Sequence, residues 1–441
     1  WSVVVLDARG RRLWEQDLPA PAWQVALSGD GRWVIAAVGD GSLRWYDADT
    51  GVQALGAFVH TNGTDWIAWR PDGHYASSPG GDAFIGWLVN DGDARAPLLV
   101  RAVQLERSLY RPELLRTALT DGSTGKSAAA AVPVRSLPRV HIESLSEADR
   151  TLRFSTRAGN LPLARIAVFA DDVPIVSRVA DAAGDQDGRI QAVTIPAELA
   201  LDRLRVEAEA GAVIGVDEMA VDSPWPATRR SGALWILAVG VERFPAFERC
   251  GRGLDCDYTV SSLPNAPQDA RQIAASLQRA GDGLFGSAHV RVLAGGAGET
   301  PTRAAVVAAL TDLQQARAGD TVVVFLGSHG IAGGGDGSGD YWFLPTDAQP
   351  TDLARVVRDT ASTSAPSLLG AGEVNELLRR VRGRRLLIVD TCHAGAVGAS
   401  RNPFTLAKRS ASSRYAVLSA STGDELSYEH PDPKVQHGAF T

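Results

Sequence analysis

The 441-residue chain is 45% hydrophobic and 22% charged, a composition typical of folded proteins, and its length predicts two to four domains. The formal net charge of −7 gives no basic footprint for nucleic acid, and no stretch approaches the ~20 apolar residues of a membrane span. Three cysteines are too few for a fold built on disulfides, which favours a reducing, cytoplasmic location.

The first ninety residues contain an internal repeat with a period of 42 residues. Eight of the eleven tryptophans lie there; Asp30-Gly31 recurs as Asp72-Gly73, and Trp45 recurs as Trp87. This period is typical of WD-type propeller blades, in which Asp-Gly forms hairpin turns and aromatic rings fill the space between blades. We therefore expect residues 1–118 to be the last blades of a WD40-like propeller whose earlier blades precede this sequence. An ordinary antiparallel meander is the alternative.

Residues 119–138 have the composition of a linker. Gly125-Lys126-Ser127 within it resembles the end of a phosphate-binding loop, but Thr120 stands where that motif needs its first glycine, so no nucleotide site is predicted. Residues 139–225 follow with short, strand-like segments separated by polar turns and predict an Ig-like β-sandwich. The expected strands are Val140–Ile142, Leu152–Ser155, Ile166–Phe169, Ile190–Ile195 and Leu204–Ala208. This segment contains no catalytic cluster, which favours a role as a spacer or clamp.

Residues 232–441 alternate apolar strands with helices, which predicts an α/β domain with a mostly parallel sheet. The expected strands are Leu234–Val241, Val290–Leu293, Thr321–Leu326, Arg385–Asp390 and Tyr415–Ser419. The expected helices lie near Asp269–Gln278, after a Thr300-Pro301 cap, and near Glu373–Val381. In such sheets the chemistry gathers at the carboxyl ends of the strands.

Two of these strand ends carry residues suited to catalysis. One strand runs into Gly327-Ser-His-Gly330 and another into Asp390-Thr-Cys-His-Ala-Gly395. His329 and Cys392 therefore form a candidate base and nucleophile, and the neighbouring glycines would let a substrate backbone approach. Each residue also has an ordinary alternative, because buried cysteines are often inert and a histidine often only satisfies a backbone carbonyl.

These segments resemble the caspase-like cysteine peptidases, particularly the bacterial caspase and metacaspase branch. The resemblance lies in Leu237-Ala-Val-Gly-Val241, Leu263-Pro-Asn-Ala-Pro-Gln-Asp-Ala270, Ser328-His-Gly330 and Asp390-Thr-Cys-His-Ala-Gly395, with Gly339–Asp347 and His437–Thr441 also similar. The segments Trp69–Asp82 and Ile85-Gly-Trp87 look like proteins in which WD repeats precede such a peptidase. The resemblance implies a caspase-like domain over residues 232–441, and it covers the middle segment only loosely.

The resemblance also implies a role for each residue. Cys392 would attack the scissile carbonyl as a thiolate, and His329 would assist it and then protonate the departing amine. The backbone N–H groups of Gly330 and Cys392 would hold the oxyanion. His393 follows the nucleophile directly, and because adjacent residues at a strand end point apart we expect it to be structural.

Substrate preference follows from two acidic residues. Metacaspase-like enzymes bind arginine or lysine before the cut through positions that match Asp269 and Asp390, and two carboxylates suit a guanidinium. The alternative is that Asp269 caps its helix and Asp390 binds backbone amides. The histidine motif departs from the metacaspase pattern in one respect. Those peptidases often have a serine two residues before the histidine, whereas this chain has Gly327 there and a serine at position 328.

The remaining expectations concern processing, metals and partners. The basic loop after Gly395 offers self-cleavage sites after Arg401, Lys408 or Arg409, although a plain solvated loop is the alternative.

Cys250 and Cys256 lack the spacing of a zinc site. Some metacaspases need calcium, and four acidic residues are candidate ligands: Asp336, Asp340, Asp347 and Asp352. We assign no calcium site to them. No other cofactor is predicted.

The predicted function is thus a cysteine endopeptidase that uses a Cys-His dyad. Its partners would be a protein or peptide substrate and a protein bound to the propeller. The alternative function, from a different class, is a catalytically silent WD-repeat scaffold that retains the caspase-like fold.

Overall fold

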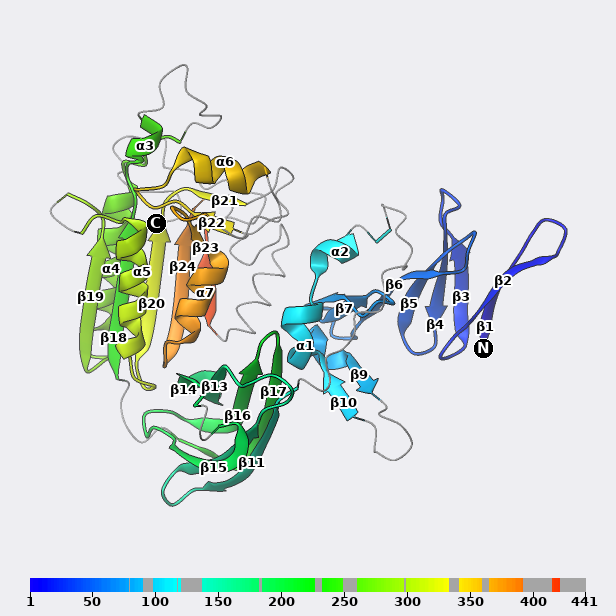
Figure 1. The fold of residues 1–441 in the computed structure, drawn as a ribbon, viewed down its shortest axis with the longest axis horizontal. Helices are drawn as coiled ribbons and strands as arrows, with labels where there is room; N and C mark the ends of the chain where they lie inside the picture. Colours follow the sequence, from blue (N-terminus) through cyan, green and yellow to red (C-terminus); the bar gives the residue numbers. More distant parts are fainter. Residues whose placement is uncertain are drawn as a thin grey trace. The chain divides into compact units, whose positions relative to one another are not determined.

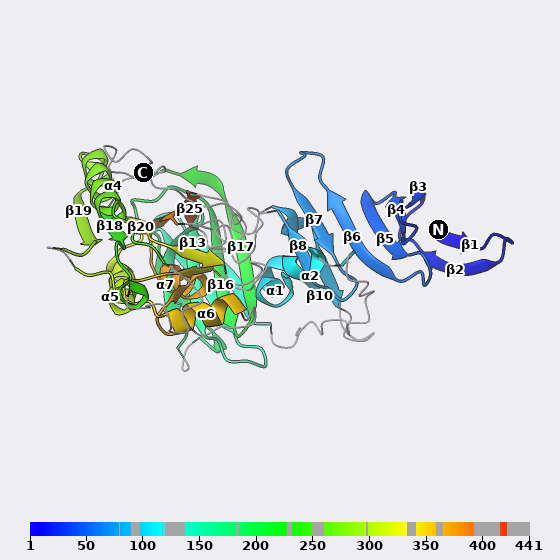
Figure 2. The same cartoon turned by 90° about the horizontal axis from the view of Figure 1, so that it is seen from above.

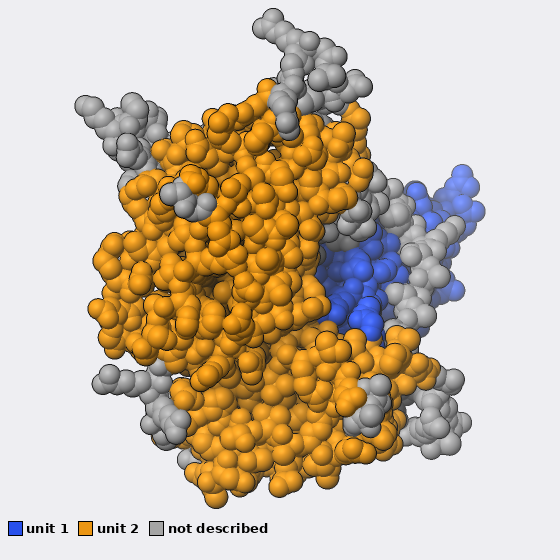
Figure 3. Space-filling model, turned by 60° about the vertical axis from the view of Figure 1, so that its left-hand side comes forward, with its two compact units in different colours: residues 1–137, 211–214 blue, residues 138–210, 215–441 orange. Residues whose placement is uncertain are grey.

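The computed structural model forms two compact units, which are coloured separately in Figure 3. Unit 1 contains residues 1–137 and 211–214, and unit 2 contains residues 138–210 and 215–441. The structure describes residues 1–78, 80–89, 98–116, 118–119, 137–181, 185–226, 232–248, 260–296, 299–332, 341–358, 365–391 and 415–420.

Unit 1 is built from antiparallel strands followed by short helices (Figure 1). The sheets are β1-β2, β3-β4-β5-β6-β7-β8 and β10-β9. The strands are β1 (Ser2–Leu6), β2 (Arg12–Asp17), β3 (Ala22–Leu27), β4 (Trp33–Val38), β5 (Ser42–Asp47), β6 (Gln53–Val59), β7 (Trp66–Trp69), β8 (Tyr75–Ser77), β9 (Gly86–Val89) and β10 (Leu98–Arg101). The helices are η1 (Gly81–Phe84), α1 (Ala102–Leu109) and α2 (Pro112–Arg116).

The 42-residue repeat of the sequence recurs in the turns of unit 1. The N–H of Gly31 donates to the carbonyl of Ser28 at 2.9 Å, and the N–H of Gly73 donates to that of Arg70 at 3.0 Å. Both glycines have positive φ, +73° and +93°, which explains why glycine stands at these positions.

One pairing in unit 1 differs from the separate blades expected of a propeller. Strand β6 pairs with β7, so six strands join in one sheet. This pairing places the ring of Trp69 against the backbone of Gly56, where an added Cβ would lie 2.4 Å from the ring. The antiparallel strands are confirmed, and the propeller stays a prediction.

Unit 2 begins with two antiparallel sheets that share a core, here called the two-sheet module. Their strand orders are β11-β12-β15 and β14-β13-β16-β17. Leu152 and Phe154 of the first sheet pack in one buried cluster with Ile166, Val168 and Val206 of the second. The strands are β11 (Arg139–Ser146), β12 (Thr151–Arg157), β13 (Arg165–Ala170), β14 (Val173–Val179), β15 (Asp187–Thr194), β16 (Leu201–Ala210) and β17 (Val213–Trp225).

The rest of unit 2 has a five-stranded parallel sheet in the order β19-β18-β20-β24-β25, which confirms the parallel sheet expected there. A small sheet, β21-β22-β23, and helix α6 lie above it in Figure 1. The strands are β18 (Ala233–Gly240), β19 (Ser287–Leu293), β20 (Thr321–Gly327), β21 (Gly330–Ala332), β22 (Tyr341–Phe343), β23 (Leu369–Gly370), β24 (Arg384–Asp390) and β25 (Ala416–Ser419). The helices are α3 (Pro245–Glu248), α4 (Ala266–Gly281), α5 (Arg303–Asp312), η3 (Leu313–Gln315), α6 (Pro350–Arg358) and α7 (Ala371–Arg379).

Helices cover both faces of the parallel sheet, as Figure 2 shows for α4 on one side and α5 and α7 on the other. Successive residues of β18 point to opposite faces: Ile236 and Ala238 pack with α4, whereas Leu237 and Val239 pack in the cluster that contains α5 and α7. Burial on both faces explains the continuous apolar run of this strand.

Two predicted helix starts need correction. Helix α5 is capped by Thr302, whose hydroxyl accepts from the N–H of Ala305, so Thr300 is not the cap. Helix α4 begins at Ala266, ahead of the expected start near Asp269, because Pro267 fits the first turn of a helix.

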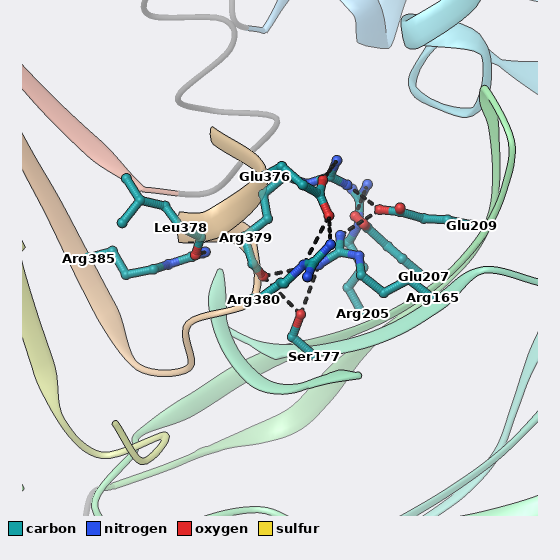
Figure 4. Close-up of polar contacts among 10 residues, drawn as sticks. All are labelled: Arg165, Ser177, Arg205, Glu207, Glu209, Glu376, Leu378, Arg379, Arg380 and Arg385. Atoms are coloured by element: carbon teal, nitrogen blue, oxygen red, sulfur yellow. Dashed lines mark hydrogen bonds and ion pairs between the residues drawn. The ribbon is translucent and has the colours of Figure 1, made fainter. Parts of the chain in front are cut away.

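A buried cluster of arginine and glutamate side chains ties the end of α7 to the two-sheet module (Figure 4). Glu209, whose side chain is 8% exposed, accepts hydrogen bonds from Arg165 and Arg379. The carbonyl of Arg379 accepts from Ser177 at 2.8 Å and from Arg165 at 3.0 Å. The two-sheet module thus supplies hydrogen-bond donors to a carbonyl in the last turn of α7. Carbonyls in the last turn of a helix have no N–H partner within the helix.

We expect Glu209→Gln to lower the free energy of unfolding by about 3 kcal/mol, because it leaves two buried guanidinium groups without the charge they share. Chemical denaturation measures the loss. Glu299→Gln is the matched control: Glu299 pairs with Arg291 at 2.6 Å, its side chain is 51% exposed, and the change should cost less than about 1 kcal/mol. Equal losses in the two variants would contradict a special role for the buried cluster.

Candidate functional site

The carboxyl ends of three parallel strands lie in one row. Gly240 of β18 pairs with Gly327 of β20, and Gly327 pairs with Asp390 of β24. In chain order the sheet runs 2-1-3-4-5, so the order reverses between β18 and β20. Sheets of this kind bind ligands outside the carboxyl ends of the strands at that reversal, which makes this row the candidate site.

Two glycines in the row have close neighbours. A Cβ on Gly240 would lie 2.2 Å from the carbonyl oxygen of Ala266, so the first turn of α4 approaches the end of β18 closely. A Cβ on Gly327 would lie 3.0 Å from the ring of Phe325, which would have to shift by a few tenths of an ångström to accept it.

His329 lies two residues beyond the end of β20 with its ring partly buried. Its Nε2 is 2.8 Å from the carbonyl oxygen of Ser261, and its ring centroid is 5.2 Å from that of the buried Phe244. A carbonyl oxygen can only accept, so Nε2 carries the proton of this hydrogen bond. In the neutral ring the basic lone pair is therefore on Nδ1.

Burial lowers the pKa of the His329 imidazole from its ordinary value of 6.5, because an apolar environment disfavours the charged ring. The hydrogen bond to Ser261 acts in the opposite direction, since it favours the protonated form. The lowered pKa means that His329 is neutral at pH 7 and can accept a proton.

Gly330, the predicted oxyanion donor, begins β21 and pairs with Phe343 of β22. The N–H of Leu344 donates to the carbonyl of His329 at 3.1 Å. Hydrogen-bonded and non-bonded pairs alternate along an antiparallel ladder, so the N–H of Gly330 is directed away from β22. This orientation is compatible with donation to a ligand.

The two predicted specificity residues lie at the same edge of the sheet. Asp390 is the last residue of β24, and Asp269 is in the first turn of α4 with only 3% of its surface exposed. Asp269 is not the helix cap, because α4 begins at Ala266. Their roles in binding a substrate stay predictions.

Several predicted residues lie outside the described residues. Cys392, His393 and the loop with Arg401, Lys408 and Arg409 are among them, and so are Cys250, Cys256, Asp336 and Asp340. Thr391, directly before Cys392 in the sequence, is described and is 1% exposed. The structure thus places the strand that leads to the predicted nucleophile, beside the strand that leads to His329.

Sequence reasoning assigned no role to three residues that shape this edge: Ser261, Phe244 and Tyr341. Ser261 acts through its backbone carbonyl, so its side chain gave no signal. Tyr341 did carry a usable signal, because a tyrosine within an apolar run usually finds a hydrogen-bond partner when buried.

The two described calcium candidates are engaged in hydrogen bonds. Asp347 accepts from the N–H of Arg303 at 2.7 Å, and Asp352 accepts from the N–H and hydroxyl of Ser367. Across the described part of the chain, no group of three or more His, Cys, Asp or Glu side chains is arranged to hold a metal ion. Within the same residues, no helix has the length and apolar character needed to cross a bilayer.

Unit 1 has a cavity of its own, of about 660 Å³. Its wall combines the aromatic rings of Trp69, Phe84 and Trp87 with Arg44, whose guanidinium pairs with Asp40 at 3.2 Å. Concave, largely apolar surfaces with a few polar groups are typical of binding sites.

No protein-family model and no curated protein matches the chain. Among solved structures, a protein from Geobacter sulfurreducens has a TM-score of 0.29 at 16% identity, covering 47% of this chain and 78% of its own. Dipeptidyl peptidase 4 from Porphyromonas gingivalis has a TM-score of 0.17 at 9% identity, covering 96% and 82%. The β-propeller domain of Cps50 (Swd1) from Myceliophteria thermophila has a TM-score of 0.12 at 9% identity, covering 52% and 81%. Likenesses this weak do not establish a shared fold or activity.

If His329 is a catalytic base, kcat/KM should fall as the pH drops through its lowered pKa, because protonation removes the acceptor. We expect the acidic limb of the pH profile to have its midpoint below pH 6.5. His289→Gln, at an exposed histidine on β19, is the control and should leave the profile unchanged. A profile with no acidic limb would contradict the base assignment.

Proposed function

We propose that the chain is a cysteine endopeptidase of the caspase and metacaspase kind, with Cys392 as nucleophile and His329 as base. The observation that carries the proposal is the parallel pairing of β20 with β24, which brings Gly327 and Asp390 into register. The histidine turn and the segment that continues to Cys392 therefore leave the sheet from adjacent strands at the same edge.

The proposed reaction begins with transfer of the Cys392 thiol proton to Nδ1 of His329, which Nε2 and the Ser261 carbonyl orient. The thiolate attacks the scissile carbonyl, and the N–H groups of Gly330 and Cys392 receive the oxyanion. His329 returns the proton to the departing amine as the carbon–nitrogen bond breaks. Water then hydrolyses the thioester and releases Cys392.

The fold assignment belongs to the same proposal. The caspase-like domain would span residues 232–441, and its 2-1-3-4-5 sheet with helices on both faces is compatible with that assignment. We also propose that residues 1–118 are WD40-like blades that bind a protein partner. The aromatic-lined cavity of unit 1 supports a binding role for this part of the chain.

The proposed substrates have arginine or lysine before the cut. Asp390 is the last residue of β24, and Asp269 lies on α4, whose first turn contacts the end of β18. Two carboxylates at one edge favour a guanidinium, which pairs with planar anions through two parallel hydrogen bonds. An aspartate-selecting enzyme would need basic residues at these positions instead.

Short fluorogenic peptides ending in Arg, Lys or Asp test the proposal, with and without calcium. We expect cleavage after Arg and Lys and none after Asp, and we expect Cys392→Ala to abolish it. Failure to cleave any peptide would favour the alternative, a silent scaffold. Cleavage after Asp would overturn the pocket assignment.

Asp390→Asn should lower kcat/KM for an arginine peptide by about 10- to 100-fold, because a charge-assisted hydrogen bond contributes roughly 1.5–3 kcal/mol. We expect the same direction for Asp269→Asn. Asp347→Asn is the matched control, since Asp347 accepts from the backbone of Arg303 and is given no part in the pocket. Equal losses for all three variants would indicate a general loss of structure, which thermal melting would reveal.

A further inference from the structure

Strand β22 and the residue after it contact both strand ends of the proposed site. On the histidine side, Leu344 holds the turn at two points: its N–H donates to the carbonyl of His329 at 3.1 Å, and its carbonyl accepts from the hydroxyl of Ser328 at 2.7 Å. Ser328 and Leu344 are 4% and 2% exposed, so these bonds are shielded from water.

On the cysteine side, the contact is made by a tyrosine. The hydroxyl of Tyr341 lies 2.6 Å from that of Thr391, the residue before Cys392 in the sequence. Tyr341 is 2% exposed and Thr391 is 1% exposed. A hydrogen bond between two buried hydroxyls is stronger than one at the surface, because water does not compete for either group.

The two sets of contacts are made by one short segment. Tyr341 and Leu344 are three residues apart, and the strand between them pairs with β21 on one side and β23 on the other. An extended segment that is held in a sheet has little freedom to change length. Its two ends therefore keep a fixed separation.

We propose that residues 341–344 form a bridge that sets the position of Thr391 relative to His329, so that Tyr341 and Thr391 are positioning residues for Cys392. The proposal rests on the proposed peptidase function and extends it by two residues that need not touch the substrate. In the absence of the bridge, Thr391 would lose its fixed position relative to the His329 imidazole. Misplacement by about 1 Å costs up to roughly 100-fold in rate.

Four single variants test the bridge. Tyr341→Phe and Thr391→Val each remove one of the two hydroxyls, whereas Thr391→Ser keeps it. Tyr415→Phe is the matched control, because Tyr415 is also buried, at 6% exposed, and its hydroxyl donates to Asn375 on α7. Thermal melting of all four variants measures how much stability is lost when a buried hydroxyl is removed.

The first readout is alkylation of Cys392 by iodoacetamide as a function of pH, followed by mass spectrometry of the peptide that contains it. This readout needs no turnover. Tyr341→Phe and Thr391→Val should shift the midpoint towards the value of a free cysteine, about 8.5, because a displaced thiol can no longer transfer its proton to Nδ1 of His329. Thr391→Ser and Tyr415→Phe should keep the wild-type profile.

The second readout is turnover of an arginine peptide. We expect kcat to fall about 10- to 100-fold in Tyr341→Phe and Thr391→Val with KM within about twofold, since the bridge does not bind substrate. The double variant should lose no more than either single one, because both remove the same contact.

The outcomes separate the bridge from the peptidase proposal. A Tyr341→Phe protein with the wild-type alkylation profile, destabilised only as much as Tyr415→Phe, would overturn the bridge. A wild-type protein that cleaves no peptide would overturn the peptidase function, and a shifted alkylation profile would still support the bridge.

Discussion

The parallel register of β18, β20 and β24 is the constraint on which the candidate site depends. Val322 and Val324 pack on one face of the sheet while Val323 and Phe325 pack on the other, so a slip by one residue would move every apolar side chain to the wrong face. The hydrophobic cores on both faces therefore fix the register. With the register fixed, the carboxyl ends of β20 and β24 align, with Gly327 beside Asp390.

The two-sheet module contacts the α/β domain at the opposite end of the parallel sheet, where β24 begins. Its arginine and glutamate cluster holds the last carbonyl of α7, and the N–H of Gly383, one residue before β24, donates to the carbonyl of Pro174 at 3.1 Å. The strand that leads to Asp390 is thus anchored where it begins by a different part of the chain. The module therefore shares polar and backbone contacts with the α/β domain.

Polar contacts hold the turns beyond the strand ends, which the apolar cores do not fix. Burial on both faces decides where a strand lies, but it does not fix the turns beyond the strand end, where the chemistry is. There the structure uses single hydrogen bonds: Ser261 with His329, Leu344 with Ser328, and Tyr341 with Thr391. The last two bonds join buried residues and gain strength from the low dielectric around them.

The sequence by itself determined the class and order of the main elements, because apolar runs, glycines and caps act over a few residues. It also determined that His329 and Asp390 lie at strand ends. It missed β14, whose Pro174 disfavours a strand, because only the fold shows that β14 lies at a sheet edge, where proline is tolerated. The tertiary structure alone decided which residues complete the site. The partners of His329 and Thr391 are 68 and 50 residues away in the sequence, and contacts at such separations depend on how the chain folds back rather than on any local pattern.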